Sequence, residues 1–81
     1  MGLKVHNVEI FQTNIKDSNN AARLKKELSI LYPYSKINFD LEDCDRILRI
    51  ETHYKINTKQ IIALGHHLGV LIKLLEDEKL L

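Results

Sequence analysis

The sequence predicts an α+β domain whose strands and helices follow the order β-α-β-β-α-β. Two kinds of pattern carry this prediction: apolar and polar residues alternate in some segments, and apolar residues recur at spacings of three and four in others. Alternation is typical of strands with one buried face, and the three-and-four spacing is typical of helices with one apolar face. The sequence in which these strand and helix patterns follow one another along the chain gives the order of the elements.

The first half of the chain predicts a strand, a helix and a second strand. Residues 5–13 are rich in β-branched and aromatic side chains, with Val8 and Ile10 on one face and Glu9 and Phe11 on the other. Asp17 or Ser18 then provides a helix cap. The predicted apolar stripe of this helix consists of Ala21, Leu24, Leu28 and Leu31. Pro33 ends the helix, and residues 35–41 alternate strictly, as in a strand.

The second half predicts a hairpin, a helix and a last strand. An acidic turn at 42–45 leads into a third strand over 46–52, whose buried face holds Leu48 and Ile50. Asn57 followed by Gln60 is a variant capping box at the start of the second helix. Its inner stripe is predicted to comprise Ile61, Leu64, Gly65 and Leu68. Gly69 stops the helix, and residues 70–75 favour a fourth strand over a continued helix.

Length and composition indicate one domain spanning residues 1–81, with a core at about 5–76 and a flexible tail at 77–81. A chain of 81 residues is at the small end for a domain and leaves no room for a second module. Twelve Lys and Arg residues against eleven Asp and Glu residues give a formal charge of +1. We therefore expect no nucleic-acid partner and no membrane partner, because the protein has no overall field to attract them.

Cysteine content and hydropathy predict a soluble, unprocessed protein of the cytoplasm. Cys44 is the only cysteine, so the chain can form neither an internal disulfide nor a zinc cage of several cysteines. The sequence also has no secretory leader pattern, and no apolar run approaches the ~20 residues of a membrane-spanning helix.

The predicted order is the split β-α-β arrangement of the ferredoxin-like fold, a sandwich of one sheet and two helices. In this fold the sheet has four antiparallel strands, and right-handed crossovers place both helices on one of its faces. The other face is then open to solvent or to a partner. One-sided burial agrees with the alternating strands.

Two segments resemble the heavy-metal-associated domain family, which comprises copper-chaperone-like modules. Residues 35–42, Ser-Lys-Ile-Asn-Phe-Asp-Leu-Glu, are similar to the second strand of that family, and residues 61–70 are similar to its second helix, which closes on a glycine. The resemblance covers about 5–76 and implies the same fold. The family's metal motif is a Cys-x-x-Cys between the first strand and first helix, whose thiolates bind soft ions. Lys16 and Asn19 occupy those two positions here, so the family's metal activity is not expected.

The resemblance without its metal motif predicts a non-enzymatic domain without a cofactor or a bound metal. We expect it to act through a protein partner or as a homodimer, by means of the open sheet face and the exposed edge strand. An RNA-recognition role would need exposed aromatic rings on the central strands, and the first strand offers only Phe11. No spacing of Ser, His and Asp, or of paired carboxylates, indicates catalysis.

Two other hypotheses remain open at this point. The first is a metal carrier with a non-standard site built from Cys44 with His66 or His67, because the predicted topology brings these residues to the same pole as Lys16 and Asp17. The adjacent histidines point about 100° apart on a helix, which does not favour chelation. The second is a regulatory domain that binds a small ligand in a pocket beside the sheet.

Overall fold

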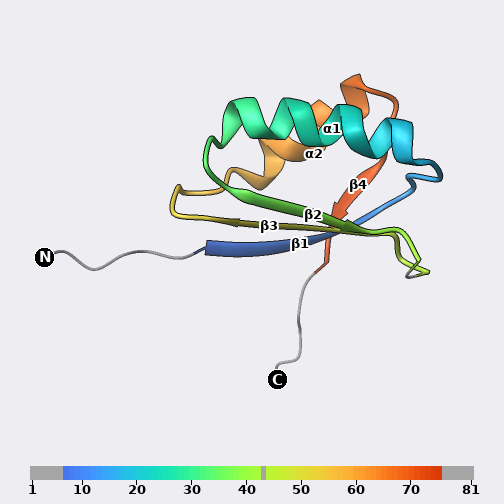
Figure 1. Cartoon of the computed structure of the whole chain (residues 1–81), viewed down its shortest axis with the longest axis horizontal. Helices are drawn as coiled ribbons and strands as arrows, with labels where there is room; N and C mark the ends of the chain where they lie inside the picture. The colour runs from blue at the N-terminus through green and yellow to red at the C-terminus, as the bar shows by residue number, and fades with distance from the viewer. Residues whose placement is uncertain (1–6, 43, 76–81) are drawn as a thin grey trace, which may run out of the picture.

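The computed structural model describes residues 7–42 and 44–75, which form one four-stranded sheet and two helices (Figure 1). The elements are β1 (Asn7–Thr13), α1 (Ser18–Leu31), β2 (Lys36–Asp40), β3 (Ile47–Thr52), α2 (Thr58–His67) and β4 (Ile72–Leu74). Their order along the chain is the predicted one. The predicted start of the first strand at Val5 and His6, Asp43 of the acidic turn, and the tail at 77–81 lie outside the described residues.

The strands lie in the order β2-β3-β1-β4, and every neighbouring pair is antiparallel. Both helices pack on the same side of this sheet (Figure 1). The predicted α+β class and the antiparallel sheet with two helices are therefore confirmed, and the arrangement is compatible with a ferredoxin-like fold. β1 and β3 lie at the centre of the sheet, whereas β2 and β4 form its edges.

The first helix begins and ends where predicted, with its C-cap at Tyr32 directly before Pro33, but its predicted buried stripe is wrong at one residue. Asp17 is its N-cap, and the carboxylate accepts a hydrogen bond from the backbone N–H of Asn20 at 2.9 Å. Leu31, predicted to lie in the buried stripe, is 38% exposed, whereas Tyr32 is 5% exposed. The reason is that Tyr32 leaves helical geometry at the C-cap, with φ −129° and ψ 76°. Its ring can then pack into the core from a position that the helical spacing does not predict.

The second helix forms only half of the predicted capping box. Asn57 is its N-cap, and the side-chain oxygen accepts a hydrogen bond from the N–H of Gln60 at 3.1 Å. The backbone N–H of Asn57 donates instead to the hydroxyl of Tyr32 at 3.0 Å. The Tyr32 ring thus connects the end of α1 to the start of α2. At the other end Gly69 has φ +81°, as expected for a glycine that stops a helix.

β4 is shorter than the predicted strand over residues 70–75. The N–H of Val70 donates to the carbonyl of Gly65 at 2.7 Å, so this residue still belongs to the turn that closes α2. Pairing with β1 starts at Ile72, opposite Thr13. It extends past the strand's assigned end, because the N–H of Leu75 donates to the carbonyl of Ile10 at 2.9 Å.

The core lies between the helices and one face of the sheet. Its fully buried large side chains are Phe11, Ile15, Leu24, Leu28, Leu48, Ile50 and Ile61. Phe11 of β1 lies opposite Leu48 of β3, at the centre of the sheet. Of the predicted inner stripe of α2, Ile61 and Gly65 are buried, while Leu64 and Leu68 are half-buried and pack against this core.

Gly65 is needed for the close approach of α2 to β4. A Cβ atom at this position would lie 2.7 Å from Cγ1 of Ile72 and 3.0 Å from the carbonyl oxygen of Val70. We expect Gly65→Ala to lower the free energy of unfolding by about 1 to 3 kcal/mol, because overpacking at this contact outweighs the gain of up to ~1 kcal/mol in helix propensity. Urea denaturation followed by circular dichroism measures the change.

Gly69→Ala is the matched comparison, because an added Cβ there has no atom within 4 Å and only the left-handed backbone is strained. It should cost about 1 kcal/mol. A Gly65→Ala variant as stable as the parent would show that helix α2 does not approach Ile72 this closely.

Candidate functional site

The candidate site is the sheet face opposite the helices, here called the open face. Successive side chains of a strand point to opposite faces, and the core takes Phe11 and Thr13 from β1 and Leu48 and Ile50 from β3. The residues between them must therefore point away from the helices. Across the sheet they form three rows, which are Lys36-Glu51-Val8, Asn38-Arg49-Ile10-Leu75 and Asp40-Ile47-Gln12-Lys73.

The open face has an apolar area on β1 and just beyond the end of β4, next to the polar Gln12 and Lys73 of the same strands. Val8 and Ile10 are separated by one residue on β1, and Leu75 lies beside Ile10 through the hydrogen bond between their backbones. Their exposed fractions are 39%, 36% and 41%. Neighbouring side chains on adjacent strands are in van der Waals reach of one another. We call Val8, Ile10 and Leu75 the apolar strip.

The part of the open face on β2 and β3 is mostly charged, with Asn38 and Ile47 as its uncharged residues. Arg49 and Glu51 form an ion pair with an N–O distance of 2.8 Å, and the Arg49 side chain is 48% exposed. Lys36 lies opposite Glu51 and Asp40 lies opposite Ile47. The Glu51 side chain is only 16% exposed, so solvent reaches mainly the Arg49 side of the pair, and ion pairs at a protein surface typically contribute about 0.2 to 1 kcal/mol to stability. Their more important effect is on specificity, because a partner of the apolar strip meets a mixed-charge surface beside it.

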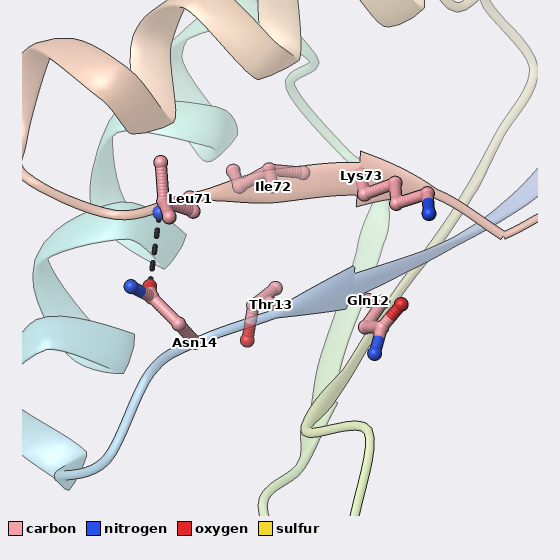
Figure 2. A pocket seen from close by; sticks show the side chains of 6 residues that line it. All are labelled: Gln12, Thr13, Asn14, Leu71, Ile72 and Lys73. Atoms are coloured by element: carbon pink, nitrogen blue, oxygen red, sulfur yellow. Dashed lines mark hydrogen bonds between the residues drawn. The ribbon is translucent and has the colours of Figure 1, made fainter.

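A solvent-open pocket of about 330 Å³ lies where β1 ends and β4 begins (Figure 2). It is lined by Gln12, Thr13, Asn14, Leu71, Ile72 and Lys73. The side-chain oxygen of Asn14 accepts a hydrogen bond from the N–H of Leu71 at 2.9 Å, and the Asn14 N–H donates to the Leu71 carbonyl at 3.2 Å. Asn14 thus fastens β4 to β1, and its oxygen is engaged in the fold.

The turn between β1 and α1 is held by the protein's own groups. The Thr13 hydroxyl donates to the carbonyl of Arg46 at 2.7 Å and accepts from the N–H of Ile15 at 3.3 Å. Ile15 is 1% exposed, so an apolar side chain fills the inside of this turn. Lys16, in the turn, and Asn19, in the first turn of α1, both lie on the surface. Neither position is arranged around a central ion.

The residues of the alternative metal site lie in two exposed segments. Cys44 is an exposed free thiol in the β2–β3 turn, and His66 and His67 are exposed at the end of α2. Asp17 of the same pole caps α1 with its carboxylate. Within residues 7–42 and 44–75, no group of three or more His, Cys, Asp and Glu side chains is placed to hold a metal ion.

Sequence reasoning missed three side chains that hold the elements of the fold in place. Asn14 fixes β4, Thr13 joins the turn to β3, and the Tyr32 hydroxyl caps α2. Each of these side chains forms a hydrogen bond with a backbone group that is far away in the sequence. Such a contact cannot be seen in the spacing of neighbouring residues. The exposure of Val8 and Ile10, however, could have been inferred from the sequence. Alternation grouped them on one face, and the choice of Phe11 for the core would have placed them outside.

In comparisons with known proteins, no family model, curated protein or solved structure matches this chain. Neither of the described helices has the length and apolar character needed to cross a membrane. Phe11, the aromatic residue of β1, is fully buried and so presents no ring for stacking on a base.

The metal hypothesis gives a direct prediction. Because Cys44, His66 and His67 are not part of a common ligand group, titration with Zn(II) and with Cu(I) should show no site of micromolar or tighter affinity that needs both Cys44 and the two histidines. Isothermal titration calorimetry under reducing conditions measures both. Binding at micromolar or tighter affinity that disappears in Cys44→Ser and in a His66→Ala, His67→Ala variant would establish the carrier hypothesis instead.

Proposed function

We propose that this protein is a non-enzymatic binding module that associates with another protein through the apolar strip of its open face. The observation that carries the proposal is the adjacency of Val8, Ile10 and Leu75, each more than a third exposed, on a face that no described helix covers. Exposed apolar side chains that gather on a rigid face and are rimmed by polar residues are typical of interaction sites.

The proposal includes the ferredoxin-like fold and the likeness to heavy-metal-associated domains. The strand order β2-β3-β1-β4 with two helices on one face supports the first. The second rests on residues 35–42 and 61–70, which form β2 with its following turn and most of α2. In this proposal Lys16 and Asn19 replace the thiolates of that family, and the fold serves association without a metal.

The chemistry of the open face indicates what kind of partner surface would fit it. An apolar strip needs an apolar counterpart, and the neighbouring Arg49–Glu51 pair and Lys73 offer both signs of charge at the rim. We therefore propose a folded protein surface or a peptide with an apolar centre and charged flanks. A reducing, cytoplasmic compartment completes the proposal, because Cys44 is the only cysteine and its thiol is free and exposed.

Ile10→Lys tests the proposal, because it places a charge at the middle of the apolar strip without altering the core face of β1. We expect a partner captured by the parent from cell extract, then purified, to lose at least about tenfold in affinity for the variant, the effect of about 1.4 kcal/mol. Fluorescence anisotropy with the two purified proteins measures the affinity, and the melting temperature shows that the variant folds.

Ala22→Lys is the matched control, because Ala22 is exposed on α1, on the helical side of the protein. It adds the same charge and should leave the affinity unchanged. Equal binding by the parent and Ile10→Lys, or a loss confined to Ala22→Lys, would refute association through the open face.

A further inference from the structure

The outer edge of β2 has backbone groups that can pair with a further strand. β2 ends the sheet order, with β3 on one side and no described strand on the other. The direction of its amides follows from the alternation of hydrogen bonds along antiparallel strands. The Ile10 carbonyl points to β4, and the Thr13 N–H points to the carbonyls of Asp45 and Arg46. The backbone N–H and C=O groups of even-numbered residues in β1 therefore point to β4, and those of odd-numbered residues point to β3.

The same alternation continues through β3 to β2. Phe11 of β1 pairs with Leu48, so Leu48 and Ile50 direct their backbone groups to β1, while Arg49 directs its groups to β2. Arg49 lies opposite Asn38. Asn38 and its even neighbours on β2 are therefore bonded to β3, and the N–H and C=O groups of Ile37 and Phe39 point to the free edge.

The sequence of this edge is complementary to itself. β2 reads Lys36-Ile37-Asn38-Phe39-Asp40, with opposite charges at equal distances from Asn38. We propose that β2 pairs antiparallel with β2 of a second copy, so that Asn38 lies opposite Asn38 and Lys36 lies opposite Asp40 of the second copy. A two-fold axis through Asn38 makes both charge pairs equivalent, as required in a symmetric dimer.

Other registers of the same pairing are poorer. A shift by one residue would place the outward backbone groups of Ile37 and Phe39 opposite even-numbered residues of the second copy. The backbone groups of those residues are bonded to their own β3, so the hydrogen bonds between the copies would be lost. A shift by two residues in one direction places Lys36 opposite Asn38 and removes both charge pairs. A shift by two in the other direction places Asp40 opposite Asn38 and Lys36 opposite Glu42, which lies in the turn beyond the end of β2. In the proposed register Ile37 lies opposite Phe39 of the second copy on the helical face, where Phe39 is only half-buried now.

This inference goes beyond the proposed function, because the β2 edge and the apolar strip are different surfaces. Lysine on an edge strand usually prevents pairing between copies, since like charges meet. Here each lysine meets an aspartate. The dimer would join the two four-stranded sheets into one continuous sheet and leave Val8, Ile10 and Leu75 of both copies accessible. A contact of this small size is expected to be reversible, with a Kd between about 1 µM and 1 mM.

Charge reversal tests the register. Lys36→Asp alone places Asp opposite Asp40 in both halves of the dimer, and Asp40→Lys alone places Lys opposite Lys36. Each variant should weaken self-association by about tenfold or more, measured by sedimentation equilibrium. An equimolar mixture of the two single variants, and the double variant Lys36→Asp, Asp40→Lys, should both associate like the parent. Lys73→Asp, an equal change on the opposite edge strand, should leave association unchanged.

A measurement on the unmodified protein keeps the test open if a variant fails to fold. Amide hydrogen exchange of Ile37 and Phe39 should slow as protein concentration rises, while that of exposed amides outside β2 stays constant. A parent that is monomeric up to about 1 mM, or exchange at both amides that is independent of concentration, would overturn the dimer. Self-association that none of the charge reversals alters would overturn this register. Both results would leave the partner binding tested by Ile10→Lys unaffected.

Discussion

The pairing of Phe11 with Leu48 beneath the helices is the constraint on which the rest of the structure depends. Strand side chains alternate between faces, so burying Phe11 commits Thr13 to the core and Val8 and Ile10 to the opposite face. The reverse choice would bury Val8 and Ile10 but expose Phe11 to water. The register with β3 favours the observed arrangement, because the face that holds Phe11 also holds Leu48 and Ile50, whereas Val8 and Ile10 lie opposite Glu51 and Arg49. The apolar strip is thus a consequence of the way the core is filled.

Polar contacts at the end of β1 give this arrangement its shape. Thr13 holds the β2–β3 turn through the Arg46 carbonyl, and Asn14 holds the start of β4 through both backbone groups of Leu71. β4 has only three residues, so these bonds set its register. That register brings Leu75 beside Ile10. The apolar strip therefore depends on two short polar side chains that do not themselves belong to it.

The sequence allowed the order of the elements to be predicted, together with the caps at Asp17 and Asn57 and the stop at Gly69, because each depends on neighbours in the chain. The features that it missed depend on distant contacts. Tyr32 rather than Leu31 enters the core, because the chain leaves the helix there and the tyrosine hydroxyl reaches Asn57. The last strand starts at Ile72 because Val70 is still bonded to Gly65.

The candidate site was predictable only in part. An open sheet face and a free edge strand follow from the fold class, and both are present among the described residues. The side chains of the open face can be identified only when it is known which face of β1 is buried. Alternation alone does not decide between the two faces. The charge symmetry of β2 was visible in the letters of the sequence. It gained meaning only when the strand order placed β2 at an edge with the amides of Ile37 and Phe39 directed outwards.

Val8 and Ile10 lie on an accessible face of the sheet, while Ile37 and Ile50 lie in the core. Relaxation of methyl protons by a soluble paramagnetic probe, measured by NMR on dilute protein, distinguishes the two faces of β1. We predict strong relaxation for the methyl groups of Val8, Ile10 and Leu75, and weak relaxation for those of Ile37 and Ile50. Weak relaxation at Val8 and Ile10 would show instead that the other face of β1 is buried and that the apolar strip does not exist.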